Sequence, residues 1–157
     1  MLQVRLLGQF EIYLDGQPII IPTRPAQSLF AFLLIHPQKS YRREKLAGQF
    51  WPNATEINAR SNLRHALWRI RKAFGTSINE RLQSDDLVVT YTPRADDQVD
   101  VYSLEACLNN EDCIDEHILA VSAYEGDLLP GFYDDWVMLE RERLQAVYER
   151  RLEKLMG

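Results

Sequence analysis

Positively charged and hydrogen-bonding side chains gather on one face of the segment 55–74. They are Ser61, Asn62, Arg64, His65, Trp68, Arg69 and Lys72, with Arg60 and Arg71 nearer the flank. Arginine forks suit guanine edges or phosphate groups, asparagine suits adenine, and lysine offers phosphate a compact charge. The face therefore holds the side chains with which proteins contact DNA. A solvated cationic helix face is the alternative that these residue types leave open.

The opposite face of the same segment is apolar, which predicts a helix packed along one side. At 100° per residue the apolar residues fall within about 40° of Leu63; they are Ala59, Leu67, Ile70 and Phe74. Thr55 is a suitable N-cap, and Gly75 can take the left-handed conformation that ends a helix. The sequence thus predicts a buried stripe that presents the polar side chains outward.

Trp68 stands in the middle of the polar face, and two roles are open for it. A partly buried tryptophan that packs against a neighbouring element is commoner than one that contacts a base. We expect Trp68 to pack against the loop 51–54 or the hairpin that follows the helix. Contact with DNA is the alternative.

Two further groups of residues could hold phosphate. Thr23 and Arg24 begin a predicted helix, where free backbone N–H groups and a guanidinium would face an anion. Arg42 and Arg43 are similarly placed at the start of the next helix. Ordinary exposed arginines are an equal alternative for each of them.

The elements that must position these residues can be predicted from periodicity and turn signals. The Asp15-Gly16 pair predicts a two-residue hairpin. We expect strands over 2–6, 10–14 and 19–21, helices over 23–36, 43–50 and 55–74, and a hairpin of strands over 82–91. This element order is typical of a winged helix-turn-helix domain, whose third helix enters the major groove. The polar stretch 94–98 predicts a domain boundary at about residue 95.

Everything after that boundary reads as helical. Helices are expected over 100–108, 114–124 and 136–156, the last with an apolar stripe of Val137, Leu144, Tyr148, Leu152 and Leu155. Helical pairs of this length make up repeat solenoids. The predicted fold class is therefore an α+β winged helix-turn-helix domain over 1–95, followed by an all-α, TPR-like helical segment over 99–157.

Charge is distributed unevenly over the 157 residues, whose formal net charge is −5. Residues 1–76 carry 11 Lys and Arg against 4 Asp and Glu, whereas residues 100–157 carry 5 against 14. Such asymmetry is typical of a basic part that binds nucleic acid joined to an acidic part that binds a protein partner.

Several classes of protein are disfavoured. There is no apolar run of the roughly 18 residues that a membrane span needs and no signal peptide, so we expect a cytoplasmic protein without membrane contact. Cys107 and Cys113 lack zinc spacing, and neither metal nor cofactor is expected. Nucleotide-binding loops and hydrolase motifs are missing, and Asp134-Asp135 is more simply a helix cap than an acid/base pair, so we expect no enzymatic activity.

Short motifs follow one another along the chain in a specific order. The first set is Leu6-Leu7-Gly8-Gln9-Phe10-Glu11, Leu14-Asp15-Gly16, Pro22-Thr23-Arg24-Pro25-Ala26-Gln27, Phe50-Trp51-Pro52, Asn62-Leu63-Arg64-His65-Ala66-Leu67 and Arg69-Ile70-Arg71. The second is Val99-Asp100-Val101, Tyr124-Glu125-Gly126-Asp127-Leu128-Leu129-Pro130-Gly131-Phe132, Asp134-Asp135-Trp136 and Glu140-Arg141-Glu142-Arg143-Leu144. With these motifs the chain resembles the SARP family (Streptomyces antibiotic regulatory proteins), which joins an OmpR-type winged helix to a bacterial transcriptional activator domain.

The resemblance implies a regulator that binds direct repeats in double-stranded DNA upstream of promoters, usually as a dimer, and recruits RNA polymerase. Three features depart from the family. Arg42 replaces a small hydroxyl residue, the hairpin tip Ser84-Asp85-Asp86 is acidic rather than basic, and the helical part is short, as in a shortened member or a piece of a longer chain. An interaction module built on a winged helix and an acidic helical domain is the alternative function.

Overall fold

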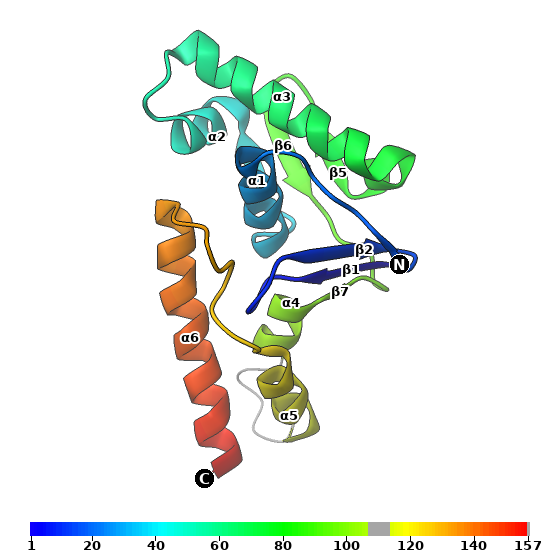
Figure 1. Ribbon diagram of the computed structural model, residues 1–157, viewed down its shortest axis with the longest axis vertical. Coiled ribbons are helices and arrows are strands. Elements are labelled where there is room, and N and C mark those ends of the chain that lie inside the picture. Colours follow the sequence, from blue (N-terminus) through cyan, green and yellow to red (C-terminus); the bar gives the residue numbers. More distant parts are fainter. Residues whose placement is uncertain (107–113, 157) are drawn as a thin grey trace. The chain divides into compact units, whose positions relative to one another are not determined.

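The computed structural model describes residues 1–106 and 114–156, which form two compact units (Figure 1). Unit 1 joins Met1–Pro18 to Asp96–Gly157, and unit 2 is Ile19–Ala95. The described residues contain both sheets and helices, in agreement with the mixed α and β content that the sequence predicts. No described helix combines the length and the apolar character needed to cross a bilayer.

Unit 1 contains a four-stranded sheet. Its strands, in the order β3-β2-β1-β7, are β3 (Gln17–Pro18), β2 (Glu11–Leu14), β1 (Leu2–Arg5) and β7 (Gln98–Val99). The Asp15-Gly16 turn joins β2 to β3, and both of its residues have positive φ, at 51° and 83°, as a tight two-residue hairpin requires. β7 pairs with β1 in parallel, with Val4 opposite Val99.

The predicted third strand over 19–21 is wrong. Strand β3 ends at Pro18, which lies opposite Tyr13. Ile20 is 81% exposed and Ile21 is 2% exposed. A proline cannot donate to a ladder, and Pro18 and Pro22 enclose this short apolar run. The run therefore connects the two units and belongs to no sheet.

The contacts also place residues 1–18 differently from the predicted domain 1–95. The chain passes from unit 2 back to unit 1 between residues 95 and 96, and the first strands belong with the segment 96–157. The cause is the long-range pairing of β1 with β7, which no local sequence signal announces.

A half-buried carboxylate binds the backbone just beyond the end of β1. Asp100 Oδ2 accepts hydrogen bonds from the backbone N–H groups of Leu6 and Leu7, each at 2.8 Å, and Oδ1 accepts one from Val101 at 2.8 Å. Burial raises the pKa of Asp100 to about 6, although these backbone N–H groups favour the ionised form. One side chain thus satisfies backbone donors just beyond β1 and in the first turn of the following helix.

Three helices follow β7 in unit 1. They are α4 (Asp100–Glu105), α5 (Ile114–Ala123) and α6 (Asp135–Met156). Residue 108, where the first helix was predicted to end, and both cysteines, Cys107 and Cys113, lie outside the described residues.

The buried stripe of α6 differs in part from the prediction. Val137 and Leu144 are buried, as expected, but farther along the helix the buried positions are Val147 and Arg151. Tyr148, Leu152 and Leu155 are half-buried instead.

The reason for this difference is Arg151, which is fully buried. Its guanidinium donates to the carbonyl of Leu104 at 3.0 Å, to the carbonyl of Ala106 and to Nδ1 of His117 at 2.7 Å. A buried guanidinium needs such partners. Arg151 therefore binds carbonyls at the end of α4, and the face of α6 that carries Arg151 and Val147 is the buried one.

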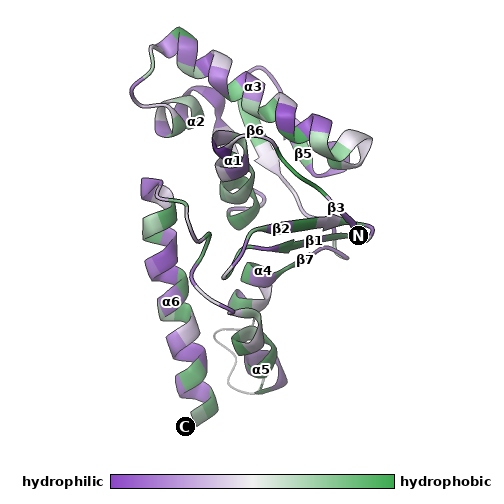
Figure 2. Ribbon diagram, viewed as in Figure 1, coloured by the Kyte–Doolittle hydropathy of each residue, from purple (hydrophilic) through white to green (hydrophobic). Residues whose placement is uncertain are grey.

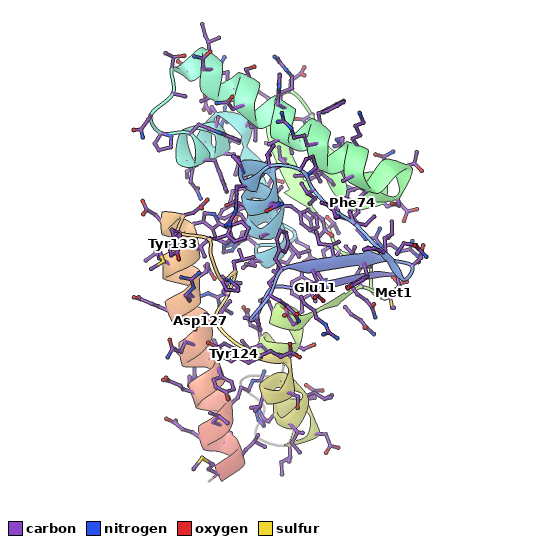
Figure 3. All side chains as sticks on the ribbon, in the orientation of Figure 1. Met1, Glu11, Phe74, Tyr124, Asp127 and Tyr133 are labelled. Atoms are coloured by element: carbon purple, nitrogen blue, oxygen red, sulfur yellow. The ribbon has the colours of Figure 1, made fainter. Side chains whose placement is uncertain are left out.

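The segment between α5 and α6 is fastened to the end of β1. The backbone N–H of Gly8 donates to the carbonyl of Asp127 at 2.8 Å, and the N–H of Leu129 donates to the carbonyl of Leu6 at 2.8 Å. Figure 3 marks Tyr124 and Asp127 at this segment. A Cβ atom on Gly126 would lie 2.9 Å from the Cα of Gly8, so the two backbones meet without room for a side chain.

Arg141 of α6 holds the same segment from its other side. Its Nε donates to the carbonyl of Leu128 at 3.0 Å, and its Nη2 donates to those of Leu129 and Phe132 at 2.9 and 3.1 Å. These contacts give a structural reason for the motif 124–132: its glycine permits a close approach of two backbones, and its carbonyls accept hydrogen bonds from an arginine fork.

Unit 2 consists of three helices and a three-stranded antiparallel sheet in the order β4-β6-β5. Its elements are α1 (Arg24–Ile35), β4 (Ser40–Arg42), α2 (Arg43–Phe50), α3 (Glu56–Phe74), the 3-10 helix η1 (Gly75–Glu80), β5 (Leu82–Ser84) and β6 (Val88–Tyr91). The three predicted helices and the hairpin are confirmed, whereas β4 was not foreseen. The ring of Phe30 on α1 lies 5.2 Å from that of Phe74 on α3 and 5.9 Å from that of Tyr91 on β6. Phe30 therefore packs α1 against both α3 and the sheet.

We expect Gly126→Ala to destabilise unit 1 by roughly 1–3 kcal/mol, because the added Cβ would force two backbones apart. Gly48→Ala is the matched control. A Cβ there, inside α2, meets nothing within 4 Å, and the substitution should be neutral or stabilising by up to about 1 kcal/mol. Urea unfolding measures both; equal effects would contradict the close approach at Gly126.

The raised pKa of Asp100 predicts how Asp100→Asn responds to pH. Because the folded protein holds this proton up to about pH 6 rather than 3.8, the associated stability is complete below pH 3.8 and is lost as the pH rises through 6. The wild type should therefore gain up to about 3 kcal/mol relative to Asp100→Asn between pH 7 and pH 4. Denaturant unfolding at both pH values measures the difference, and a constant difference would contradict it.

Candidate nucleic-acid interface

Helix α3 buries one face and exposes the other, as the sequence predicts. The buried residues are Ala59, Leu63, Ala66, Leu67, Ile70 and Phe74. Thr55 Oγ1 accepts from the backbone N–H of Asn58 at 3.2 Å, and Gly75 ends the helix with φ 69°. Figure 2 shows hydrophilic and hydrophobic residues alternating along this helix. The apolar stripe thereby fixes which side chains face outward.

Most of the predicted contact residues lie on that outward face. Asn62, Arg64, His65, Trp68 and Lys72 are exposed, and Ser61 and Arg69 are half-buried. Within residues 1–106 and 114–156 no side chain pairs with Arg64 or Arg69. Arg60 differs, because its Nη2 lies 2.8 Å from Glu56 one turn earlier. Two guanidinium groups of α3 thus keep their donors for a partner.

Arg71 has a role inside unit 2 instead. Its Nη2 donates to the carbonyl of Leu82 at 3.2 Å and to Oγ of Ser84 at 2.9 Å, while Nη1 donates to Oδ1 of Asn79 at 3.3 Å. These contacts tie β5 and η1 to α3. Arg71 therefore positions the hairpin, a role that its place on the predicted helix wheel did not reveal.

The expectation that Trp68 packs against another element is wrong. The side chain is 57% exposed, and the ammonium of Lys72, one turn later on α3, lies 4.7 Å from the centroid of its ring. The loop 51–54 was expected to pack against Trp68, but its aromatic residue, Trp51, has its ring 6.1 Å from the ring of Phe50 instead. Trp68 is thus an outward-facing aromatic side chain with a cation over its ring.

A hollow of about 320 Å³ lies beside the first half of α3. Its lining consists of Arg42, Arg43, Glu44, Arg60, Leu63, Arg64, Asp86 and Leu87. Four guanidinium groups against two carboxylates make this hollow cationic. The sequence placed Arg43 and Arg64 among the contact residues, but it gave no sign that β4, α2, α3 and the hairpin bring the four arginines to one place.

Arg42 is the N-cap residue of α2, and its side chain makes no capping hydrogen bond to the backbone of that helix. Its Nε lies 3.3 Å from Glu44 Oε1 instead. The absence of a hydroxyl at this position, noted as a departure from the SARP pattern, thus leaves the helix without a side-chain cap and adds an arginine to the hollow.

The acidic hairpin tip is partly explained by its own turn. Asp85 Oδ1 accepts from the backbone N–H groups of Leu87 at 2.7 Å and Val88 at 2.8 Å, and these bonds lower the pKa of Asp85. Its carbonyl accepts from Arg43 Nη1 at 3.3 Å. The Asp85 carboxylate therefore closes the turn, while Asp86 lines the hollow.

Thr23 and Arg24 stand at the start of α1, as predicted. Thr23 Oγ1 accepts from the backbone N–H of Ala26 at 3.5 Å, and Pro25 occupies the first turn. The backbone of Thr23 has φ 70°. Both residues are exposed.

No protein-family model and no curated protein matches the sequence. Among solved structures, EmbR of Mycobacterium tuberculosis, determined in complex with a low-affinity phosphopeptide, matches over 99% of this chain with a TM-score of 0.66 and 16% identity. The chain has an EmbR-like fold. It spans 42% of the length of the EmbR chain. The likeness suggests a winged-helix domain.

Because Arg71 holds the hairpin, Arg71→Ala should lower the free energy of unfolding by about 1–3 kcal/mol. Arg64→Ala removes an exposed guanidinium from the same helix and should stay within about 0.5 kcal/mol of the wild type. Urea unfolding of both variants measures this difference. Indistinguishable midpoints would remove Arg71 from its positioning role.

Proposed function

We propose that the chain is a sequence-specific DNA-binding transcriptional regulator that binds promoter direct repeats through α3. The observation that carries the proposal is the outward face of this helix, where Asn62, Arg64, His65, Arg69 and Lys72 stand opposite a fully packed stripe. With its side chains an α-helix is about 10–12 Å in diameter, so α3 can enter the major groove, which is about 12 Å wide.

The side chains of α3 divide by chemistry into readers of bases and neutralisers of phosphate. Arg64 and Asn62 can form bidentate contacts with guanine and adenine, respectively. Lys72 offers a point charge and little base information, so its partner is phosphate. Arg69 has free donors for either task.

The hollow beside α3 suits the DNA backbone. Arg42, Arg43, Arg60 and Arg64 line it, and guanidinium forks bind phosphate oxygens through charge-assisted, often bidentate hydrogen bonds. Thr23 and Arg24 at the start of α1 supply a further phosphate contact through exposed groups of a helix start. The positive balance of residues 1–76 supports this assignment.

The sequence resemblance to SARP proteins and the EmbR-like fold agree with this function. We infer from the resemblance that two copies bind adjacent repeats and that the acidic unit 1 recruits RNA polymerase. Unit 1 offers apolar side chains for such protein contacts, since Tyr133 is 78% and Leu139 69% exposed. The same exposure favours the second candidate, a protein interaction module without DNA.

Binding of the full chain to a selected direct-repeat duplex and to a random duplex, at two salt concentrations, tests the proposal. The logarithm of affinity should fall with the logarithm of salt concentration by about 0.9 for each phosphate neutralised. Arg64→Ala should cost about 1–3 kcal/mol on the repeat and less on random DNA, whereas Lys72→Ala should weaken both equally.

Arg150→Ala is the matched control, because it removes the same charge from an exposed position on α6. It should leave the preference for the repeat unchanged. A flat response to salt, or an equal effect of Arg64→Ala and Arg150→Ala, would favour the protein interaction module.

A further inference from the structure

The outward face of α3 carries two exposed apolar side chains beside its charged ones. At 100° per residue, Ile57, Ser61 and Trp68 lie within about 40° of one another around the helix axis, on the side away from Leu63. Ile57 is 79% and Trp68 57% exposed. Neither is required by the core, which the opposite stripe supplies. The face of the helix that would meet a groove therefore carries two side chains, Ile57 and Trp68, for which phosphate is no partner.

Lys72 holds the Trp68 ring in place. Its ammonium lies 4.7 Å from the ring centroid, a cation–π contact between residues one turn apart. The contact covers part of one ring face and leaves more than half of the side chain exposed. Because Lys72 also carries the charge that would meet the backbone, its binding to phosphate and the position of the indole are linked.

The base edges in the major groove offer few partners for such a surface. Guanine, cytosine and adenine present hydrogen-bond donors and acceptors there, and only thymine adds an apolar group, its C5 methyl. Resting on the proposed DNA-binding function, we propose that Trp68 packs against a thymine methyl group in the major groove. Trp68 then makes the target site specific for an A·T pair at one position, next to the base that Arg64 contacts.

The experiment begins with a duplex selected from a random pool by the full-length wild-type chain. Each thymine of that duplex is then replaced, one at a time, by deoxyuridine, which lacks only the C5 methyl. Wild-type affinity, measured by fluorescence anisotropy of labelled DNA, should fall about fourfold at one position, the factor expected for one buried methyl group. Trp68→Ala should bind thymine and deoxyuridine equally at that position, and Trp68→Phe should keep most of the difference.

Leu119→Ala is the control, since it removes an apolar side chain that is 65% exposed on α5 of unit 1; it should keep the wild-type pattern. Trp68→Gln provides a second variant without the ring, so that the test does not depend on the folding of one substitution. Unchanged melting temperatures confirm that the variants are folded.

Three outcomes would overturn the proposal. If no deoxyuridine weakens the wild type, no methyl group is read. If Trp68→Ala and Trp68→Gln keep the wild-type deoxyuridine pattern, another residue reads the methyl. If Trp68→Ala and Trp68→Gln weaken binding to every duplex by the same factor, and the loss of affinity at the deoxyuridine position is still seen, Trp68 only positions the helix. In each case specific DNA binding persists, whereas failure of the selection to yield any site would overturn the proposed function itself.

Discussion

The parallel pairing of β1 with β7 is the constraint on which the architecture depends. It joins residues 95 positions apart in the sequence, and the Asp97 carboxylate, accepting from the N–H of Leu2 at 3.1 Å, reinforces it across the same distance. Asp100 then takes the N–H groups beyond the end of β1, where the ladder has stopped. Because β1 and β7 meet in one sheet, residues 19–95 are an insertion between them, and this insertion forms a core of its own.

Within unit 2, the proposed DNA binding depends on the two unlike faces of α3, one apolar and buried and the other polar and outward. Packing of α3 through Leu63, Leu67 and Ile70 leaves only one direction for its polar side chains. The arginines of α3 then differ in their partners. Arg71 binds the hairpin, Arg60 pairs with Glu56, and Arg64 pairs with no described side chain. Identical residue types on one helix thus differ in role because their surroundings differ.

The sequence predicted features that local chemistry determines. Thr55 and Gly75 mark the ends of α3, Asp15-Gly16 marks a hairpin, and the apolar period of α3 identifies its buried face. The sequence could not predict the pairing of β1 with β7, since no residue near either strand specifies a partner so far along the chain. Trp68 was misjudged for a related reason: its type favours burial on average, but only the positions of the neighbouring elements decide whether anything covers it.

The discontinuity of unit 1 has a consequence for synthesis. Unit 2 is one continuous stretch and has all its partners as soon as residue 95 has left the ribosome. The β1–β2 hairpin emerges before unit 2, yet it must wait for β7, between about 5 and 20 s later at ordinary elongation rates. A two-stranded hairpin alone is marginally stable in water. The β1–β2 hairpin is therefore made before unit 2 but becomes ordered after it, and the inserted unit folds before the unit that encloses it in the sequence.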